Sequence, residues 1–531
     1  MTDTAETVDL LVIGGGINGV GIARDAALRG LSTLLLEARD FGSGTSSWSS
    51  RLIHGGLRYL EYGEISLVRE SLHERRTLLK IAPHLVRPLR LVIPLYRDGT
   101  RSPFVVRLGM LAYDLLSLGK ALPRHRMLGT DEVIAGAPGI RRDGLVGAAS
   151  YFDAQVTFAE RLVVENVVAA AEAGATLRNY AVVTKLELGT DGPHRVTWDD
   201  AREGGERSVR ARVVVNAAGP WVDRVLGLSN AGAPRLMGGT KGSHLVVDPF
   251  PGAPQDACYV EAADGRPVFI IPWNGQYLIG TTDIRYDGDP AEATPSAAEV
   301  EYLLATLHAV FPSAGLTPAE INFAYAGVRP LPYVEAGPES AITRRHIIRR
   351  HAGRGLYSII GGKLTTYRNL AEQVTDRVQK ALGLPVTATR TADAPLPGGH
   401  EATVPEALRP LRPAGQQRLL ALYGSRCQRL AELCRERPDY AEPVAAGSGV
   451  IAAEVALALR DEYALTLVDL LHRRLMTGLD ADLGAAAADA IAAVAAREAG
   501  WDGQRLAAER DALAAWTARL SLAGMRDARQ S

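Results

Sequence analysis

The pattern of apolar and polar positions divides the chain into three kinds of segment. In the N-terminal part, continuous apolar runs alternate with stretches of helical spacing, which predicts buried strands separated by helices. Between residues 235 and 345 short strand-like runs alternate with turns, as in Lys241–Val247 and Tyr277–Asp283, which predicts a mainly antiparallel sheet. From about Pro395 onward the helical period returns, in residues 405–423, 451–472 and 483–520, so we expect an all-helical C-terminal region.

The first alternation, residues 9–37, places a glycine motif between a strand and a helix. An apolar run leads directly into Gly14-x-Gly16-x-x-Gly19, and a second apolar run ends at Glu37. In a dinucleotide-binding unit the first glycine makes the tight turn, the second lets a pyrophosphate approach backbone N–H groups, and the third allows close helix packing. Glu37 stands where a carboxylate can accept hydrogen bonds from ribose hydroxyls. The stretch predicts an adenine dinucleotide site, with FAD and NAD both open and an ordinary βαβ unit as the alternative.

Three later stretches are predicted to join the same unit. Residues 151–175 predict a short strand followed by a long amphipathic helix. Period-two runs at residues 181–188 and 208–216 predict a hairpin that feeds a buried strand, and ligands of open α/β sheets lie at the carboxyl end of such a strand. The chain returns through residues 356–368 as a strand, a glycine turn and a helix, whose positive end can face a flavin that gains negative charge.

The bulk composition narrows the classes of function. At 531 residues the chain exceeds one compact core, and we expect roughly three domains. The net charge of −1 gives no general attraction to nucleic acid, so no nucleic-acid partner is expected. The three cysteines form no CxxC pair, which favours a reducing compartment and predicts neither a disulfide framework nor a metal site.

Two further features bear on localisation. The first nine residues show no signal-peptide pattern. The apolar stretch 103–122 predicts a buried or interfacial helix, and its charges at Arg107, Asp114 and Lys120 argue against a bilayer span. Residues 64–90 predict a helix with a basic face. This face could contact anionic lipid, or it could be solvated and balanced by glutamates, and the sequence favours neither alternative.

A loop of small hydroxylated residues after Glu37 leads into candidate chemistry. Residues 45–61, TSSWSSRLIHGGLRYLE, offer short side chains and free N–H groups that can wrap phosphates, and then a histidine and an arginine around a glycine pair. A surface linker is the plainer alternative. This stretch closely resembles the corresponding part of the FAD-dependent glycerol-3-phosphate dehydrogenases, as do GVRP at residues 327–330 and GGKLTTYR at residues 361–368. The resemblance extends from Asp9 to roughly Arg474.

The resemblance implies an α/β fold with three parts. A glutathione-reductase-like FAD-binding (Rossmann-type) domain would be assembled from residues 1–80, 151–234 and 341–390. An antiparallel-sheet substrate domain with a membrane-contact region would comprise residues 81–150 and 235–340, and an all-helical C-terminal cap domain residues 391–531. Within the hydroxylated loop, Trp48 and Arg51 look less typical of the family, which leaves the local packing around a flavin open.

The resemblance also favours FAD over NAD as the cofactor. The residues implied as its contacts are Gly14, Gly16, Gly19, Glu37, Thr45, Ser46, Ser47, Val182, Gly219, Gly362, Leu364 and Thr365. The reaction implied is the oxidation of sn-glycerol 3-phosphate to dihydroxyacetone phosphate, with hydride passing from C2 to flavin N5. The residues implied around the substrate are Arg58, Tyr59, Arg329 and Lys363.

Two residues are candidates for the chemical step. His54 has the unperturbed pKa nearest to operating pH, which suits the group that takes the hydroxyl proton. Arg329 stays protonated and can stabilise a developing alkoxide or bind phosphate. The plainer alternatives are a structural histidine, a surface turn at Arg329, and a Lys363 that contacts only the flavin.

The family resemblance implies partners as well. Electrons would leave for a membrane quinone, and the protein would lie in the cytoplasm, peripherally attached to the cytoplasmic membrane, with a homodimer among the options. An oxidase that reduces oxygen has the same motifs, an amine or amino-acid oxidase shares the N-terminal fingerprint, and a flavin-binding module without activity is the non-enzymatic alternative.

Overall fold

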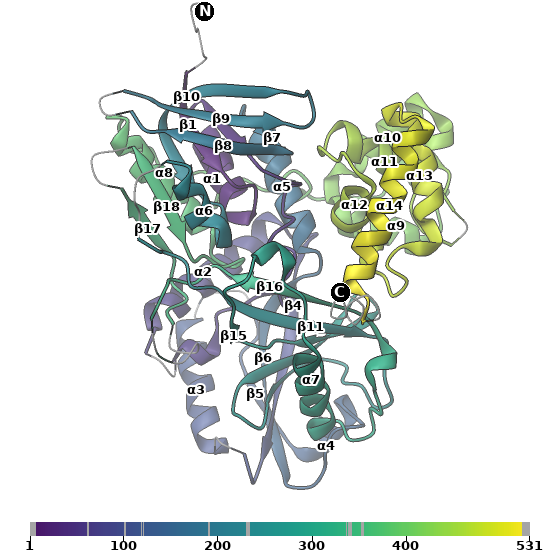
Figure 1. Cartoon of the computed structure of the whole chain (residues 1–531). Helices are drawn as coiled ribbons and strands as arrows, with labels where there is room; N and C mark the ends of the chain where they lie inside the picture. The colour runs from purple at the N-terminus through teal and green to yellow at the C-terminus, as the bar shows by residue number, and fades with distance from the viewer. Residues whose placement is uncertain are drawn as a thin grey trace, which may run out of the picture.

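The computed structural model describes residues 7–60, 63–99, 102–117, 119, 122–189, 192–229, 234–335, 337, 342–351, 355–445 and 447–522, except for the side chain of Arg58. Two sheets and a helical domain make up this part of the chain (Figure 1). The first sheet, sheet A, has a parallel centre in the order β18-β10-β1-β2-β7. These strands are Leu356–Ile360, Glu206–Asn216, Thr7–Ile13, Thr33–Leu36 and Thr176–Arg178.

The predicted hairpin in sheet A contains one strand more than the sequence pattern indicated. β8 (Ala181–Glu187) pairs with β9 (His194–Asp200), which in turn pairs with the first half of β10, all antiparallel. The prediction missed β9 because its apolar positions are interrupted by polar residues, although His194 and Thr197 are buried in the structure. At the other edge β17 (Ile347–Arg350) runs antiparallel to β18.

Three helices cover one face of the parallel strands. α1 (Ile17–Leu28), α5 (Ala159–Glu172) and α8 (Tyr367–Ala381) share one apolar core with β1 and β10. This confirms the predicted order of strand, glycine turn and helix at both ends of the unit. Because β1 connects to β2 on one side while β10 flanks it on the other, the carboxyl end of β1 is the switch point at which open α/β sheets bind ligands.

The second sheet, sheet B, is mixed but mainly antiparallel, as expected. Its path runs β15-β11-β14-β13-β12-β4-β6-β3, with β16 beside β11 and β5 beside β6. In that order the strands are Ile284–Arg285, Thr240–Val247, Gln276–Gly280, Pro267–Trp273, Ala257–Glu261, Val86–Tyr96, Leu145–Val156, Leu52–Ile53, Ile321–Arg329 and Arg126–Leu128. Only β12 and β4 pair in parallel among the described neighbours. α7 (Ala297–Val310) and α4 (Thr130–Gly136) pack on this sheet.

The prediction of one helix over residues 64–90 is wrong for residues 82–90. α2 (Ile65–Ile81) ends before Pro83, and the chain continues as β4. Proline cannot donate to a helical hydrogen bond, so the pattern of basic residues beyond it belongs to a strand. The expected basic face is divided: Arg69, His73 and Arg76 are exposed, while Arg75 is buried.

Sheet membership also bears on the proposed domain limits. The boundary at residue 150 falls inside β6, which pairs with β4 along its whole length in sheet B. The short β3, within the segment assigned to cofactor binding, pairs with β6 as well. We therefore propose that the substrate region includes residues up to 156 and that β3 belongs to it.

α3 (Pro103–Leu116) carries apolar side chains both on its buried face and on the face that is exposed to the solvent. Val106, Met110 and Tyr113 are buried against the molecule, whereas Phe104 is 75% and Leu115 68% exposed. Val105, Leu108 and Leu111 extend this exposed apolar face. Among the helices that the structure describes, none has both the length and the apolar character needed to cross a bilayer.

The C-terminal region is helical, as predicted, but more broken than its pattern suggested. Its helices are α9 (Pro413–Tyr423), α10 (Cys427–Glu436), α11 (Ala452–Arg460), α12 (Leu467–Asp469), α13 (Ala485–Ala499) and α14 (Gly503–Leu520). The periodic stretch 451–472 breaks at Tyr463, which has a positive φ of 62° and turns Glu462 inward to Arg161. The stretch 483–520 breaks at Gly500 for the same backbone reason.

Candidate functional site

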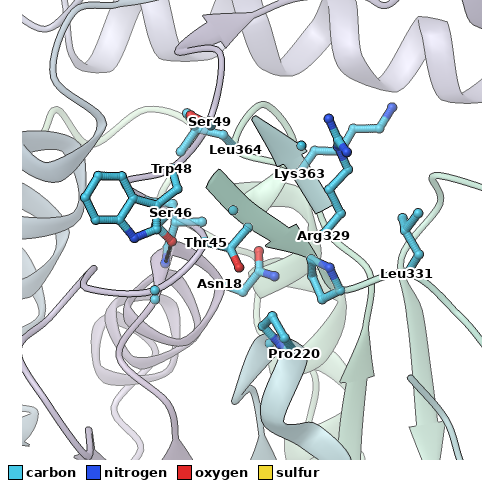
Figure 2. A pocket seen from close by; sticks show the side chains of 18 of the residues that line it. Asn18, Thr45, Ser46, Trp48, Ser49, Pro220, Arg329, Leu331, Lys363 and Leu364 are labelled. Atoms are coloured by element: carbon cyan, nitrogen blue, oxygen red, sulfur yellow. Dashed lines mark hydrogen bonds between the residues drawn. The ribbon is translucent and has the colours of Figure 1, made fainter. Parts of the chain in front are cut away.

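A cavity of about 1150 Å³ lies between the carboxyl end of sheet A and the adjoining face of sheet B. Its walls come from the turn after β1, the loop after Asp40, the end of β16 and the turn after β18. Figure 2 shows Asn18, Thr45 and Ser46 near its centre and Arg329 and Lys363 at one side. Segments separated by more than 300 positions in the sequence thus line one cavity.

Two glycines of the motif, Gly14 and Gly19, are fitted so closely that no side chain could replace them. Gly14 has φ +109°, and a Cβ there would lie 2.7 Å from the carbonyl oxygen of Ala217. A Cβ at Gly19 would lie 1.8 Å from the carbonyl oxygen of Gly14, so α1 packs directly on the turn. Gly16 caps α1 and lines the cavity, and the Ile17 N–H that follows donates to Ser46 Oγ over 3.0 Å. The positive end of α1 therefore faces the cavity, as an anionic pyrophosphate requires.

The acid at the end of β2 is held by the same turn. Glu37 accepts the N–H of Gly15 over 2.6 Å and the N–H of Arg39 over 2.8 Å. Burial raises the pKa of this carboxyl, and these two N–H groups oppose the shift. Val182 and Gly219 also line the cavity, and their contacts with a cofactor stay predictions.

The hydroxylated loop divides into residues that line the cavity and residues that brace it. Thr45 and Ser46 line it, and Thr45 Oγ1 donates to the carbonyl oxygen of Val328 over 2.7 Å. Ser47, implied as a cofactor contact, instead donates to Gly42 O over 2.6 Å, is buried, and does not line the cavity. We therefore reassign Ser47 to bracing of the loop.

The two less typical residues of this loop, Arg51 and Trp48, each contact a different part of the molecule. Arg51 is buried with φ +58° and forms an ion pair with Glu160 at 2.7 Å. The ring of Trp48 lies 5.3 Å from that of Tyr325 and 5.9 Å from that of Trp516 on α14. The loop is thereby fixed to sheet B and to the C-terminal domain.

His54 is half-buried in the cavity wall, directly after β3. Burial lowers the pKa of its imidazole to about 4, with Asp153 opposing the shift and Lys363 and Arg75 adding to it. The ring is therefore neutral at pH 7 and able to accept a proton. Its backbone N–H donates to Thr365 Oγ1 over 3.2 Å, which ties it to the turn after β18.

Arg329, the last residue of β16, is not on a surface turn. Its guanidinium donates to Asp283 Oδ1 over 3.0 Å, to Thr281 Oγ1 over 3.1 Å and to the carbonyl oxygen of Thr282 over 3.1 Å. Asp283 also pairs with Arg344 at 2.8 Å. Burial alone would raise the pKa of Asp283, but the two guanidinium groups hold it below its usual value.

Lys363 is a cation of this cavity with unused hydrogen-bonding capacity. Its Nζ lies 3.8 Å from the ring centroid of Tyr59 and has no hydrogen-bond acceptor among the described residues. Burial lowers its pKa. Tyr59 lines the cavity, and its contact with the substrate stays a prediction. The side chain of Arg58 lies outside the described part of the chain, so its predicted contact stays a prediction too.

Comparison with known proteins places this site in a family. The model described as "FAD dependent oxidoreductase" matches residues 9–368, and that described as "C-terminal domain of alpha-glycerophosphate oxidase" matches residues 389–506. A glycerol-3-phosphate dehydrogenase from Synechocystis is 47% identical over 487 residues, which cover 88% of this chain and 88% of that protein. The chain belongs to the family of FAD-dependent glycerol-3-phosphate dehydrogenases.

Two further comparisons bear on the members of this family. The X-ray structure of the glycerol-3-phosphate dehydrogenase from Bacillus halodurans complexed with FAD matches with a TM-score of 0.79 and 29% identity, over 98% of this chain and 96% of that one. A D-erythritol 1-phosphate dehydrogenase from Brucella abortus is 39% identical over 483 residues, which cover 88% of this chain and 94% of that protein. The expected fold class and the choice of FAD over NAD are confirmed.

The residues present fit an FAD-dependent glycerol-3-phosphate dehydrogenase. The glycine cradle at the start of α1 and the carboxylate of Glu37 suit the dinucleotide end. At the other end Leu364 and Thr365 line the cavity, and Gly362 adopts φ +103° where a Cβ would lie 2.3 Å from Asn18 Nδ2. Such a close approach leaves the backbone of the turn as the wall, which suits a flat ring system.

Sequence reasoning missed three polar residues that line the same cavity. His244 on β11 accepts or donates a hydrogen bond with Ser50 at 2.8 Å and stacks on Tyr325, and Asp283 and Arg344 form the cluster around Arg329. His244 lies within a predicted strand and the other two lie in connecting segments, so no local pattern marked them. These residues converge only when sheet B forms.

Proposed function

We propose that the chain catalyses the FAD-dependent oxidation of sn-glycerol 3-phosphate to dihydroxyacetone phosphate. The observation that carries this proposal is a dinucleotide cradle that shares one cavity with a neutral histidine and with the Lys363 ammonium, which has no hydrogen-bond acceptor among the described residues. A buried cation without an acceptor is costly, and a substrate phosphate would supply the missing acceptor. Family membership supports the same substrate class.

The residues of the chain divide the work as follows. FAD, when bound, supplies the hydride acceptor at N5. His54 takes the proton of the C2 hydroxyl, since its ring is neutral at pH 7. Arg329 lies ready to stabilise the charge that develops on that oxygen, because Asp283 and Thr281 fix its guanidinium. Lys363 and, on the motif alone, Arg58 bind the phosphate.

An anaerobic visible spectrum tests this proposal. Addition of sn-glycerol 3-phosphate to the purified flavoprotein is expected to bleach the flavin band. D-erythritol 1-phosphate tests how far a longer polyol phosphate is accepted, and glycine tests the amino-acid oxidase alternative. A flavin that glycine bleaches and sn-glycerol 3-phosphate does not would overturn the assignment, and no flavin band after reconstitution would overturn the cofactor site.

We further propose that a quinone takes the electrons. Oxygen uptake and quinone reduction by the substrate-reduced enzyme separate the two acceptors. Faster reoxidation by a water-soluble quinone analogue than by air-saturated buffer is expected. Stoichiometric peroxide at the full turnover rate would instead identify an oxidase.

Attachment to the cytoplasmic membrane is proposed to occur through α3. Its outward face of Phe104, Leu108, Leu111 and Leu115 is exposed, and burying such side chains in the interface of a bilayer contributes about 1.5–3 kcal/mol each at full burial. In flotation with vesicles of phosphatidylglycerol and phosphatidylethanolamine, Leu108→Gln with Leu111→Gln should weaken binding about tenfold or more. Val386→Gln, which alters an exposed apolar residue elsewhere, is the control. Equal binding of all variants would contradict this site.

A homodimer is proposed as the assembly. Sedimentation equilibrium of the holoenzyme at micromolar concentration distinguishes a dimer from the 56.7 kDa monomer.

A further inference from the structure

A buried cluster behind the cavity wall holds the residue that follows His54. The N–H of Gly55 lies 3.2 Å from Asp153 Oδ1 and 3.2 Å from the hydroxyl oxygen of Tyr113. The Tyr113 hydroxyl donates in turn to both carboxylate oxygens of Asp153, over 2.8 and 2.9 Å. Arg75 completes the cluster through an ion pair with Asp153 at 2.5 Å and a hydrogen bond to the carbonyl oxygen of Phe152.

Three elements converge in this cluster. Asp153 belongs to β6, Tyr113 to the inner face of α3 and Arg75 to α2, and all three side chains are at most 2% exposed. A buried carboxylate requires this much compensation: a guanidinium, a hydroxyl and a backbone N–H. Gly55 has no room to move, because a Cβ there would lie 2.3 Å from the Tyr113 hydroxyl.

The cluster fixes the peptide between His54 and Gly55 from one side. From the other side the His54 N–H is tied to Thr365 Oγ1. With both neighbouring N–H groups engaged, the position of the His54 Cα is determined by residues that do not themselves line the cavity, apart from Thr365. The Asp153 carboxylate is also the negative charge that raises the pKa of His54, against the opposing effect of burial.

We propose that Asp153, supported by Tyr113 and Arg75, is a positioning residue for His54. It holds the His54–Gly55 peptide so that the imidazole faces the substrate, and its charge stabilises the imidazolium that forms when His54 takes the hydroxyl proton. This inference rests on the proposed role of His54. It assigns α2 and α3 a part in the chemical step although neither supplies a group that reacts.

Two variants test the cluster in the holoenzyme. Asp153→Asn removes the charge, and Tyr113→Phe keeps the ring packing but removes the hydroxyl. Glu74→Gln is the matched control for Asp153→Asn. Like Asp153, Glu74 is a buried carboxylate paired with an arginine, Arg368, at 2.6 Å, but it lies on α2 and does not contact Gly55. Tyr423→Phe is the control for the second, because its buried hydroxyl has no hydrogen-bond partner among the described residues.

Two readouts are needed for each variant. Hydrogen exchange of peptides covering residues 54–57 reports whether the Gly55 N–H is released, independently of activity. Anaerobic stopped-flow reduction separates the rate of flavin reduction from the dissociation constant of sn-glycerol 3-phosphate. In both variants, Asp153→Asn and Tyr113→Phe, hydrogen exchange in this segment should be at least tenfold faster. Flavin reduction should be at least tenfold slower in Asp153→Asn and at least threefold slower in Tyr113→Phe. The dissociation constant should stay within twofold in both. The controls should change neither quantity.

The outcomes separate the inference from the proposed function. Faster exchange with an unchanged reduction rate would overturn the positioning role and leave a structural cluster. Unchanged exchange would overturn the inference outright. If Asp153→Asn does not fold, Tyr113→Phe decides alone. His54→Asn with normal reduction would refute His54 as the base, and the exchange data would still show whether the cluster holds the loop.

Discussion

At the scale of single residues, the cations of the cavity differ in how far the protein already satisfies them. Arg329 shares Asp283 with Arg344, whereas Lys363 lies over the ring of Tyr59 without an acceptor. A bound phosphate therefore gains more binding free energy from Lys363, whose N–H donors are unused, than from Arg329, whose donors are already engaged. We expect Arg329 to act mainly on the rate of the chemical step, by stabilising the charge that develops on the substrate oxygen, and Lys363 to act mainly on substrate affinity.

Replacement of Lys363 by methionine tests this division. A hydrogen bond to a charged group contributes about 1.5–3 kcal/mol, so the dissociation constant of sn-glycerol 3-phosphate should rise roughly 10- to 150-fold. This dissociation constant is measured from the dependence of the flavin-reduction rate on substrate concentration, in anaerobic stopped-flow experiments. Lys80→Met, which removes a charge from an exposed pair with Asp393, is the control. Normal affinity in Lys363→Met would contradict the phosphate role.

The pH dependence of flavin reduction belongs to His54. Because burial lowers its pKa to about 4, the ring stays neutral as the pH falls from 7 to 5 and can still accept the proton. The acid limb of the limiting reduction rate should therefore lie well below 6.5, and the limb should be missing in His54→Asn. Substrate phosphate titrates near pH 6, so the comparison must use the rate at saturating substrate. A limb at 6.5 or above would show that the site does not keep the ring neutral.

At the scale of elements, local patterns predicted what is local. The strand, glycine turn and helix at residues 9–37 and 356–368 were predicted because an apolar run, glycines and helical spacing follow one another within a single short stretch of the sequence. β9 was missed because its burial depends on β8 and β10 rather than on its own period. His244 and Asp283 escaped notice because only sheet B brings them to the cavity. The site was therefore predictable where it is a motif and not where it is a meeting of distant segments.

The glycine turn after β18 offers a test at this scale. Gly362→Ala places a Cβ 2.3 Å from Asn18 Nδ2 at φ +103°, so the turn must withdraw from α1. We expect FAD affinity to fall at least tenfold together with a loss of about 1–3 kcal/mol of stability from backbone strain. Gly383→Ala is the control, because Gly383 has φ +72° but no atom within 4 Å of the added Cβ. Backbone strain in Gly383→Ala should lower the free energy of unfolding without weakening the binding of FAD. Equal effects on FAD would mean that the approach to Asn18 does not matter.

At the scale of the whole molecule, buried ion pairs join the C-terminal helices to the cofactor-binding sheet. Arg161 on α5 pairs with Glu462 at 2.6 Å, and Arg426 pairs with both Glu165 and Glu462. Asp40, at the start of the hydroxylated loop, pairs with Arg473 at 2.6 Å and with Arg474 at 2.8 Å in a π-helical turn at residues 470–474. Figure 1 shows this helical domain packed beside α5. The loop that lines the cavity thus begins at the joint between two domains.

Asp40→Asn tests whether that joint stabilises the molecule and the loop together. The change leaves Arg473 and Arg474 buried without their shared counter-charge, and loss of one partner of a buried pair costs about 3–5 kcal/mol. Urea unfolding followed by tryptophan fluorescence should show that loss, and FAD should dissociate faster because the loop after Asp40 is no longer anchored. Asp393→Asn, which breaks the exposed pair with Lys80, should change the free energy of unfolding far less, because water screens an exposed ion pair. A stability loss in Asp40→Asn with unchanged FAD dissociation would show that the joint supports the domains but not the loop; no loss at all would show that the carboxylate adds nothing to the joint.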